Sequence, residues 1–191
     1  MNLKILSFTL EKKELPGSIP IPTGGTSLLG YINGKTLIMA KGGPPRSVTK
    51  TAYILNVSPI IASAWKSSSA HKVKPDDFVC VMGFSGIDFA AIDLACTFAQ
   101  AVTVPIQAAY GFETLNSMLK EIEPTTMATT IDDLAMTLKL SLSRSSVKSL
   151  IVFDYDENDD DNRAAYEKAG SALADAASDI ALISIQNLIA A

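Results

Sequence analysis

The chain has 191 residues, a formal net charge of −4 and 48% hydrophobic residues, which is the usual level for a globular domain. Its 16 lysine and arginine residues are scattered, so no nucleic-acid partner is expected, and no apolar run approaches the ~18 residues that a membrane span needs. The apolar start runs into Glu11 and Lys12, which does not fit a secretory signal. The sequence therefore predicts a cytoplasmic protein without a membrane span.

The N-terminal region differs in kind from the rest. Two short apolar runs, Leu28 to Ile32 and Lys35 to Met39, flank Asn33-Gly34, the strongest two-residue hairpin signal. A stretch rich in glycine and proline follows as a linker. We therefore expect a small β-hairpin segment with its linker over 1–45 and an α/β subdomain over 46–191.

Beyond the linker, short apolar runs alternate with helical patterns, which is typical of βα units that feed a mostly parallel sheet. The expected strands are Phe78–Met82, Ala101–Ile106, Thr126–Thr129, Ser149–Phe153 and Ile180–Ile185. The expected helices are Ala52–Trp65, Asp88–Gln100, Glu113–Glu121, Asp132–Leu142 and Asn162–Ala177. The first of these helices contains Pro59, so it is expected to be interrupted or to begin near that residue.

These patterns define the fold class. It is α/β, with an open, mostly parallel sheet and helices on both faces, as in Rossmann and flavodoxin-like folds. The runs Phe78–Met82, Val102–Ile106 and Leu150–Phe153 are apolar on both alternating faces. Because strands covered on both faces have this composition, we expect all three to be interior strands.

The glycine turn after the first of these strands, Gly83 to Gly86, lies between a strand and a helix. Its backbone N–H groups could hold an anion, although two glycines at such a position usually only permit a tight turn. Ser85 in this turn is not a hydrolase nucleophile, because the G-x-S-x-G pattern is missing and the single histidine, His71, precedes the strand.

An acidic stretch from Asp154 to Asp161 resembles the start of a calcium loop. Its sixth position is Asp159 instead of glycine and its twelfth is Ala165 instead of glutamate, so we expect no metal site but a solvated turn. Asp161 or a neighbour is expected to cap the next helix. Cys80 and Cys96 are also expected to be buried free thiols, since their spacing fits neither a metal site nor a redox pair.

Five segments carry a likeness to a known family. They are Lys74–Phe89, Ile92–Leu94, Val102–Gln107, Glu123-Pro124 and Leu150–Tyr155. Together they resemble the adenylation domain of carboxylic acid reductases, within the superfamily that includes acyl-CoA synthetases, peptide-synthetase adenylation domains and luciferases. The acidic continuation after Tyr155 favours the reductases. One departure is Gln100, where the family commonly has glycine.

The resemblance implies a reaction in which ATP and a carboxylic acid form an acyl adenylate, with transfer of the acyl group to a thiol. In the reductases this thiol belongs to a phosphopantetheine, and an NADPH-dependent domain then releases an aldehyde. The matching part is the first subdomain, and the phosphate loop and catalytic lysine would follow residue 191. We therefore expect the truncated N-terminal portion of such an enzyme, inactive alone and without a cofactor, while the parent enzyme uses ATP and magnesium.

Open α/β sheets bind ligands at the carboxyl ends of their strands. The residues expected to touch substrate are therefore Gly83, Phe84, Ser85, Gln107 and Ala108, and no catalytic residue is expected. Two other hypotheses remain open. The chain could be a stand-alone flavodoxin-like module that binds a nucleotide or anion at the glycine turn, or a noncatalytic assembly protein.

The C-terminal segment is strongly apolar. Its six large aliphatic residues are Ile180, Leu182, Ile183, Ile185, Leu188 and Ile189. Exposed apolar surface costs about 25 cal/mol per Å², so we expect another copy of the chain to cover this segment in a homo-oligomer.

Overall fold

The computed structural model describes residues 27–32, 35–40, 46–83 and 86–190, with side chains from residue 53 onward. The chain divides between Asn56 and Val57 into two compact units. The domain boundary expected at residue 45 stays a prediction. Within the described ranges, no helix combines the length and apolar character that crossing a membrane requires.

The smaller unit contains a two-stranded antiparallel sheet. Strand β1 (Ser27–Ile32) pairs with β2 (Lys35–Ala40), and the register joins Ile32 to Lys35. The expected N-terminal hairpin is therefore confirmed. The turn residues Asn33 and Gly34 and the linker over 41–45 lie outside the described residues.

The first helix, α1 (Arg46–Ser67), is longer than expected and runs through Pro59. The prediction of a helix interrupted or begun near this proline is wrong. Proline removes one backbone donor, whereas burial of the side chains around it favours the continuous helix. The buried apolar side chains of α1 are Val57, Ile61, Ala64 and Trp65.

The larger unit is built on a five-stranded sheet with the order β4-β3-β5-β6-β7, in which every described pair is parallel. The strands are β3 (Phe78–Met82), β4 (Val102–Ile106), β5 (Thr126–Thr130), β6 (Ser149–Phe153) and β7 (Ala181–Ser184). Taken in chain order, this is the 2-1-3-4-5 arrangement of flavodoxin-like folds. The predicted α/β class is confirmed.

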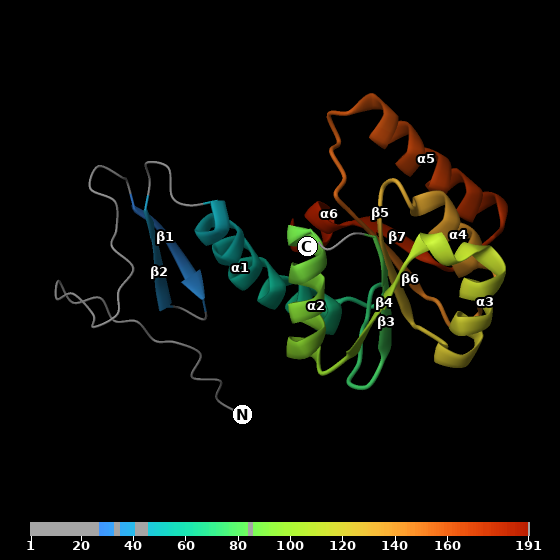
Figure 1. The fold of residues 1–191 in the computed structure, drawn as a ribbon, viewed down its shortest axis with the longest axis horizontal. Helices are drawn as coiled ribbons and strands as arrows, with labels where there is room; N and C mark the ends of the chain where they lie inside the picture. Colours follow the sequence, from blue (N-terminus) through green and yellow to red (C-terminus); the bar gives the residue numbers. More distant parts are fainter. Residues whose placement is uncertain (1–26, 33–34, 41–45, 84–85, 191) are drawn as a thin grey trace. The chain divides into compact units, whose positions relative to one another are not determined.

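Helices cover both faces of this sheet (Figure 1). They are α2 (Ile87–Ala99), α3 (Gly111–Ile122), α4 (Leu134–Leu142), α5 (Asp160–Asp175), the short α6 (Ile185–Ala190) and a 3₁₀ turn η1 (Ala108–Tyr110). Helix α2 lies on one side of the sheet, and α3, α4 and α5 lie on the other (Figure 1). Right-handed crossovers explain why the helices lie on opposite faces. The chain moves in one direction along the sheet from β3 to β4 and in the opposite direction from β4 to β5, so the connecting helices α2 and α3 lie on opposite faces.

The centre of the sheet is fully buried. Every residue of β5 and of β6 is buried, and β6 lies between β5 and β7, so the expectation of an interior strand at Leu150–Phe153 is confirmed. Strand β3 also lies between two strands, as expected. The apolar runs therefore locate the strands that helices cover from both sides.

The expectation that Val102–Ile106 is an interior strand is wrong, because β4 forms an edge of the described sheet. Val102 is 43% exposed, and Pro105 is also exposed. Proline has no N–H to donate to a further strand, so an edge tolerates it better than the interior does. The apolar pattern of β4 therefore does not indicate a second neighbouring strand.

Gln100 is the C-cap residue of helix α2 and adopts the left-handed conformation at φ 61° and ψ 27°. A side chain is disfavoured there by about 1–2 kcal/mol, whereas glycine is not. Gln100→Gly is therefore expected to raise the free energy of unfolding by about 0.5–1 kcal/mol. This gain is smaller than the conformational cost that is relieved, because glycine also makes the unfolded chain more flexible. Urea denaturation measures it, with Gln100→Ala as the control that keeps Cβ. An equal gain from both variants would contradict this explanation.

The C-terminal segment is more buried than its sequence suggested. Ile185 and Leu188 of α6 are fully buried within the chain. The remaining four residues of the apolar set, which are half-exposed, are Ile180, Leu182, Ile183 and Ile189. Part of the surface expected to need an outside partner is thus covered by the chain's own core.

Candidate functional site

A hollow of about 490 Å³ opens at the carboxyl edge of the sheet, where β3 and β4 end. We call it the edge hollow. Its lining residues are Gly83, Phe89, Pro105, Ile106, Gln107, Ala108, Ala109 and Asp133. Three of the residues expected to touch substrate, Gly83, Gln107 and Ala108, thus line one hollow. The other two, Phe84 and Ser85, lie outside the described residues.

Gly83 follows β3 directly and has a φ of +142°, which side chains rarely adopt. A Cβ at this position would lie 2.5 Å from Cγ2 of Thr130 and 3.2 Å from Cζ of Phe153. The backbone of this turn therefore passes against the ends of β5 and β6 at a distance that only glycine permits. The structural role of this glycine is established by these contacts alone.

Asp133 is a residue of the hollow that the sequence analysis missed. It lies between β5 and α4, and its carboxylate is fixed by Thr130, whose hydroxyl donates to Oδ2 at 3.2 Å and accepts from the Asp133 backbone N–H at 3.3 Å. The signal that could have found it is the pair Asp132-Asp133, which comes one residue after the strand that ends at Thr130, since neighbouring parallel strands end at the same edge.

A buried chain of hydroxyl groups ties the start of α4 to the sheet. Thr137 Oγ1 lies 2.8 Å from Thr129 Oγ1, 3.3 Å from Met82 Sδ and 3.0 Å from the carbonyl oxygen of Asp133. The Thr137 N–H also donates to that carbonyl at 3.0 Å. The backbone of Asp133 is therefore held from both the helix and the strands.

Further carboxylates lie at the same edge. The backbone N–H of Asp154, just after β6, donates to Oδ2 of the buried Asp88 at 3.3 Å. Burial raises the pKa of Asp154 above its ordinary value, and repulsion from Asp88 and Asp132 raises it further. Several carboxylates thus lie at the carboxyl edge, and each of them disfavours a bound anion nearby.

This shift predicts how stability depends on pH. The pKa of Asp154 is higher in the folded than in the unfolded protein. Protonation of this carboxyl group therefore stabilises the fold fully at pH values below the unfolded-state pKa of 3.8, and this stabilisation is lost as the pH rises through the folded-state pKa. Asp154→Asn is therefore expected to raise the melting temperature at pH 7, and the gain should shrink as the pH approaches 3.8. Asp93→Asn, an exposed aspartate of α2, controls for net charge. Equal gains from both variants would refute the local cause.

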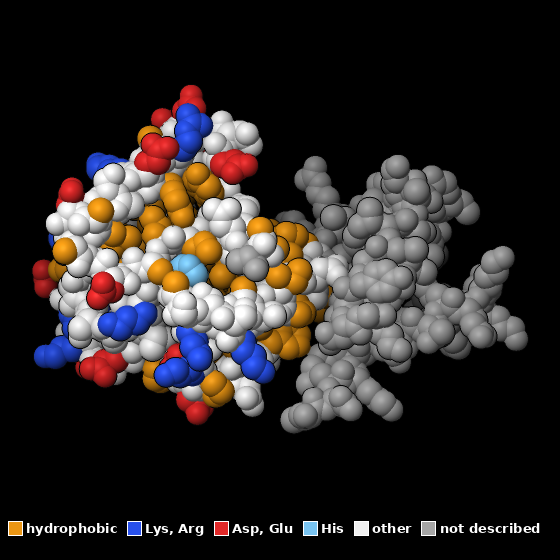
Figure 2. All heavy atoms as spheres, turned by 180° about the vertical axis from the view of Figure 1, so that it is seen from behind, with side chains coloured by type: hydrophobic (Ala, Val, Ile, Leu, Met, Phe, Trp, Pro, Cys, Tyr) orange, Lys and Arg blue, Asp and Glu red, His pale blue; other side chains and the backbone are white. Residues whose placement is uncertain are grey.

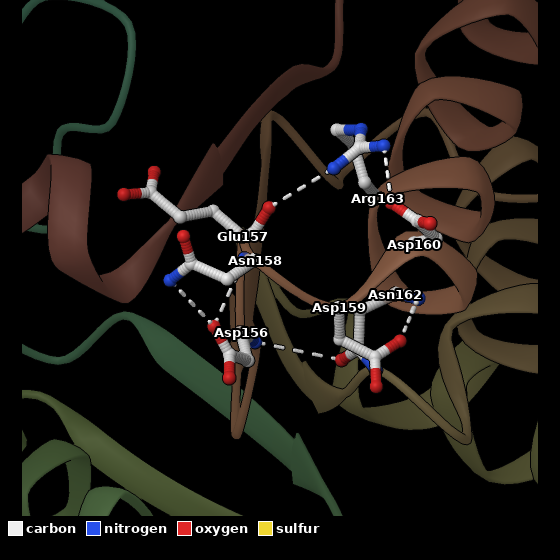
Figure 3. A network of polar contacts seen from close by, with 7 residues as sticks. All are labelled: Asp156, Glu157, Asn158, Asp159, Asp160, Asn162 and Arg163. Atoms are coloured by element: carbon white, nitrogen blue, oxygen red, sulfur yellow. Dashed lines mark hydrogen bonds and ion pairs between the residues drawn. The ribbon is translucent and has the colours of Figure 1, made fainter.

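The acidic turn between β6 and α5 is stabilised by its own side chains (Figure 3). Asp159, not Asp161, caps α5 by accepting a hydrogen bond from the Asn162 N–H at 2.9 Å, which lowers the pKa of Asp159. Asp156 accepts from the backbone and side chain of Asn158, and Arg163 pairs with Asp160 at 2.5 Å. Through these contacts the acidic residues stabilise the turn and the first turn of α5.

The single histidine lies away from the hollow. His71 Nδ1 is 2.8 Å from Oγ of Ser149, the first residue of β6, so this pair is at the amino edge of the sheet. Burial lowers the pKa of His71 and raises that of Cys80 to about 12 and that of Cys96 to about 11. Both cysteines are buried and free, as expected. High pKa values make such thiols unreactive.

The edge hollow does not fit a triphosphate or its magnesium ion. Among the described residues that line it there is no lysine or arginine, and the one charged group in this set is the carboxylate of Asp133. Phosphate recognition needs cations or a run of free backbone N–H groups. Among the described residues, no group of three or more histidine, cysteine, aspartate or glutamate side chains could hold a metal ion.

Comparisons with known proteins agree with this architecture. The family model for "AMP-binding enzyme" matches residues 68–184. The carboxylic acid reductase of Mycobacterium marinum is 37% identical over 110 residues, which are 58% of this chain and 9% of that protein. The reductase of Segniliparus rugosus is 30% identical over 137 residues, which are 72% of this chain and 12% of that protein.

Solved structures show the same relationship. The adenylation domain of the carboxylate reductase from Mycobacterium chelonae has a TM-score of 0.67 and 28% identity, covering 87% of this chain and 25% of that one. The A-PCP didomain of the S. rugosus reductase, in complex with AMP, has a TM-score of 0.69 at 24% identity, covering 87% of this chain and 23% of that one. The chain thus spans only a small part of its curated relatives.

The family match covers more than half of the chain, and its bounds at residues 68 and 184 enclose all five strands of the parallel sheet. The chain therefore belongs to the AMP-binding enzyme family, of which it carries part of the domain.

Proposed function

We propose that this chain supplies the front subdomain of an adenylation domain of the carboxylic acid reductase type, which activates a carboxylic acid with ATP. The observation that carries the proposal is the family match over 68–184, which includes the entire parallel sheet and the edge hollow. In this proposal Gly83, Gln107 and Ala108 contact the acid, while the reacting phosphates are bound elsewhere.

The cofactors of the proposed parent enzyme bind outside the edge hollow. ATP and magnesium need cationic or phosphate-binding groups, which the described lining residues of the hollow do not offer. A reductase would additionally use NADPH and a phosphopantetheine-bearing carrier. We therefore propose that the isolated chain, in the cytoplasm, activates no acid without the remaining parts of an adenylation domain.

A pyrophosphate-exchange assay tests this function. The chain alone should show no acid-dependent exchange, whereas a chimera that joins it to the rest of the M. marinum adenylation domain should show exchange. The intact M. marinum domain is the positive control. Exchange by the chain alone would overturn the proposal of a partial site, and a folded chimera without exchange would overturn the assignment to acid activation.

The alternative of a stand-alone nucleotide or anion module is less well supported. The strand order matches flavodoxin-like proteins, but the carboxylates of Asp88, Asp132, Asp133 and Asp154 gather at the edge where such ligands bind. A negative edge opposes phosphate binding. Mass spectrometry of the purified protein under native conditions distinguishes the alternatives, because a retained nucleotide would favour the binding module.

An assembly role remains compatible with the surface, and we propose a homo-oligomer that uses the C-terminal segment. Figure 2 shows hydrophobic side chains over the middle of one face, with acidic and basic side chains around them. Strand β7 is an edge of the described sheet, and half-exposed apolar side chains remain on β7 and α6. Such an edge can pair with a second copy across a two-fold axis.

Light scattering at micromolar concentration should therefore give at least twice the 20.3 kDa mass of one chain. Ile189→Lys should shift the protein toward monomer, because it places a charge on the half-exposed apolar side of α6. Asn187→Lys makes a similar change in charge at an exposed position of the same helix and should leave the mass unchanged. A monomer in the unmodified protein would refute this association.

A further inference from the structure

The walls of the edge hollow are mostly apolar. Five of its lining residues, Phe89, Pro105, Ile106, Ala108 and Ala109, offer hydrocarbon surface, and its volume of about 490 Å³ lies in the range of small-molecule pockets. These walls can hold an aliphatic or aromatic group. They cannot recognise a charged group, and the polar side chains among the described lining residues are Gln107 and Asp133.

Asp133 is prepared to accept a hydrogen bond from a ligand. Its Oδ2 already accepts from the Thr130 hydroxyl, and its backbone is held by Thr137 and Thr130. Among the residues that the structure describes, Oδ1 accepts no hydrogen bond. One oxygen thus orients the carboxylate, and the other remains available at the wall of the hollow, which is the arrangement that charge-assisted recognition requires.

The surroundings add to the preference for a cation. Asp132 is the neighbour of Asp133 in the chain, and at the same edge the backbone N–H of Asp154 donates to the carboxylate of Asp88. Among the described residues that line the hollow there is no lysine or arginine. A ligand carboxylate would be repelled at this point, whereas a protonated amine would be attracted.

We infer that the edge hollow binds a ligand whose apolar body ends in a protonated amine, with Asp133 as the residue that selects the amine. If the proposed function holds, this ligand is the acid substrate of the parent enzyme. That acid would carry an amino group distant from its carboxylate, with the amine in the hollow and the carboxylate directed away from it.

NMR titration of the ¹⁵N-labelled chain tests the inference with three probes that share one body: 3-phenylpropylamine, 3-phenylpropanol and 3-phenylpropanoate. The amine should shift the amide signals of Ala108, Ala109 and Asp133, with the alcohol weaker and the carboxylate weakest. Asp133→Asn should weaken amine binding about tenfold, because it removes a charge-assisted hydrogen bond, and should not weaken alcohol binding to the same extent.

Two variants keep the result interpretable. Asp132→Asn makes the same charge change beside the hollow but does not alter a lining residue. Amine binding should therefore weaken by less than about threefold, because solvent and salt screen the attraction between Asp132 and the amine. Ala109→Leu fills the hollow and should weaken all three probes. Equal binding of the amine and the carboxylate, or amine binding unchanged in folded Asp133→Asn protein, would overturn the inference.

The two proposals fail separately. A chimera that exchanges pyrophosphate, combined with a hollow that does not prefer amines, would overturn the amine-selecting role and leave acid activation in place. Amine binding that depends on Asp133, combined with an inactive folded chimera, would support the binding site and overturn acid activation.

Discussion

Replacing Gly83 with alanine is expected to lower the free energy of unfolding by about 3–5 kcal/mol. The new Cβ would lie 2.5 Å from Cγ2 of Thr130, a contact that folded proteins do not tolerate, and the φ of +142° adds backbone strain. Chemical denaturation of the two proteins measures the difference. A loss below about 1 kcal/mol would mean that the turn shifts freely, and the close packing described here would be refuted.

Two control variants separate overlap from strain. Thr130→Ser removes Cγ2 but keeps the hydroxyl that orients Asp133, so Gly83→Ala should cost about 1–2 kcal/mol less in that background. Gly111→Ala introduces a Cβ with no atom within 4 Å at a φ of +71° and should cost only about 1–2 kcal/mol. If the Gly83 and Thr130 variants are additive, the overlap is not the cause.

Truncation of Phe153 to alanine should lower the free energy of unfolding by about 3–5 kcal/mol, which is as much as Gly83→Ala. Phe153 ends the interior strand β6 and is one of the largest side chains with no exposed surface. Its removal leaves a cavity between the sheet and the glycine turn. Urea denaturation again gives the difference, and Phe98→Ala serves as the control, because Phe98 is 38% exposed and should cost about 1 kcal/mol or less. Similar losses for both would contradict the assigned core.

Much of the fold follows from the sequence because buried parallel strands need apolar side chains on both faces. The positions of β3 and β6 were predictable for this reason, whereas the hairpin of β1 and β2 was predictable from Asn33-Gly34. Apolar composition does not reveal strand order, however. Val102–Ile106 is as apolar as an interior strand, yet β4 is an edge, because its position depends on which way the crossover through α2 turns.

The candidate site was only partly predictable. Gly83, Gln107 and Ala108 follow strand ends, so their meeting at one edge could be expected from a parallel sheet. Asp133 was not predicted as a site residue and only fell within the helix expected over Asp132–Leu142. Its place in the hollow depends on β5 lying beside β3, which is a long-range pairing that local patterns do not contain.

The proline of β4 has a consequence for how the sheet could grow. At the β4 edge, Pro105 has no N–H to donate to an incoming strand. The hydrogen bonds to such a strand would be interrupted there, which disfavours edge-to-edge association of chains through β4. Strand β7, at the opposite edge, contains no proline. Addition of strands to this sheet is therefore directional, and a swapped or aggregated species should form through β7 and leave β4 free.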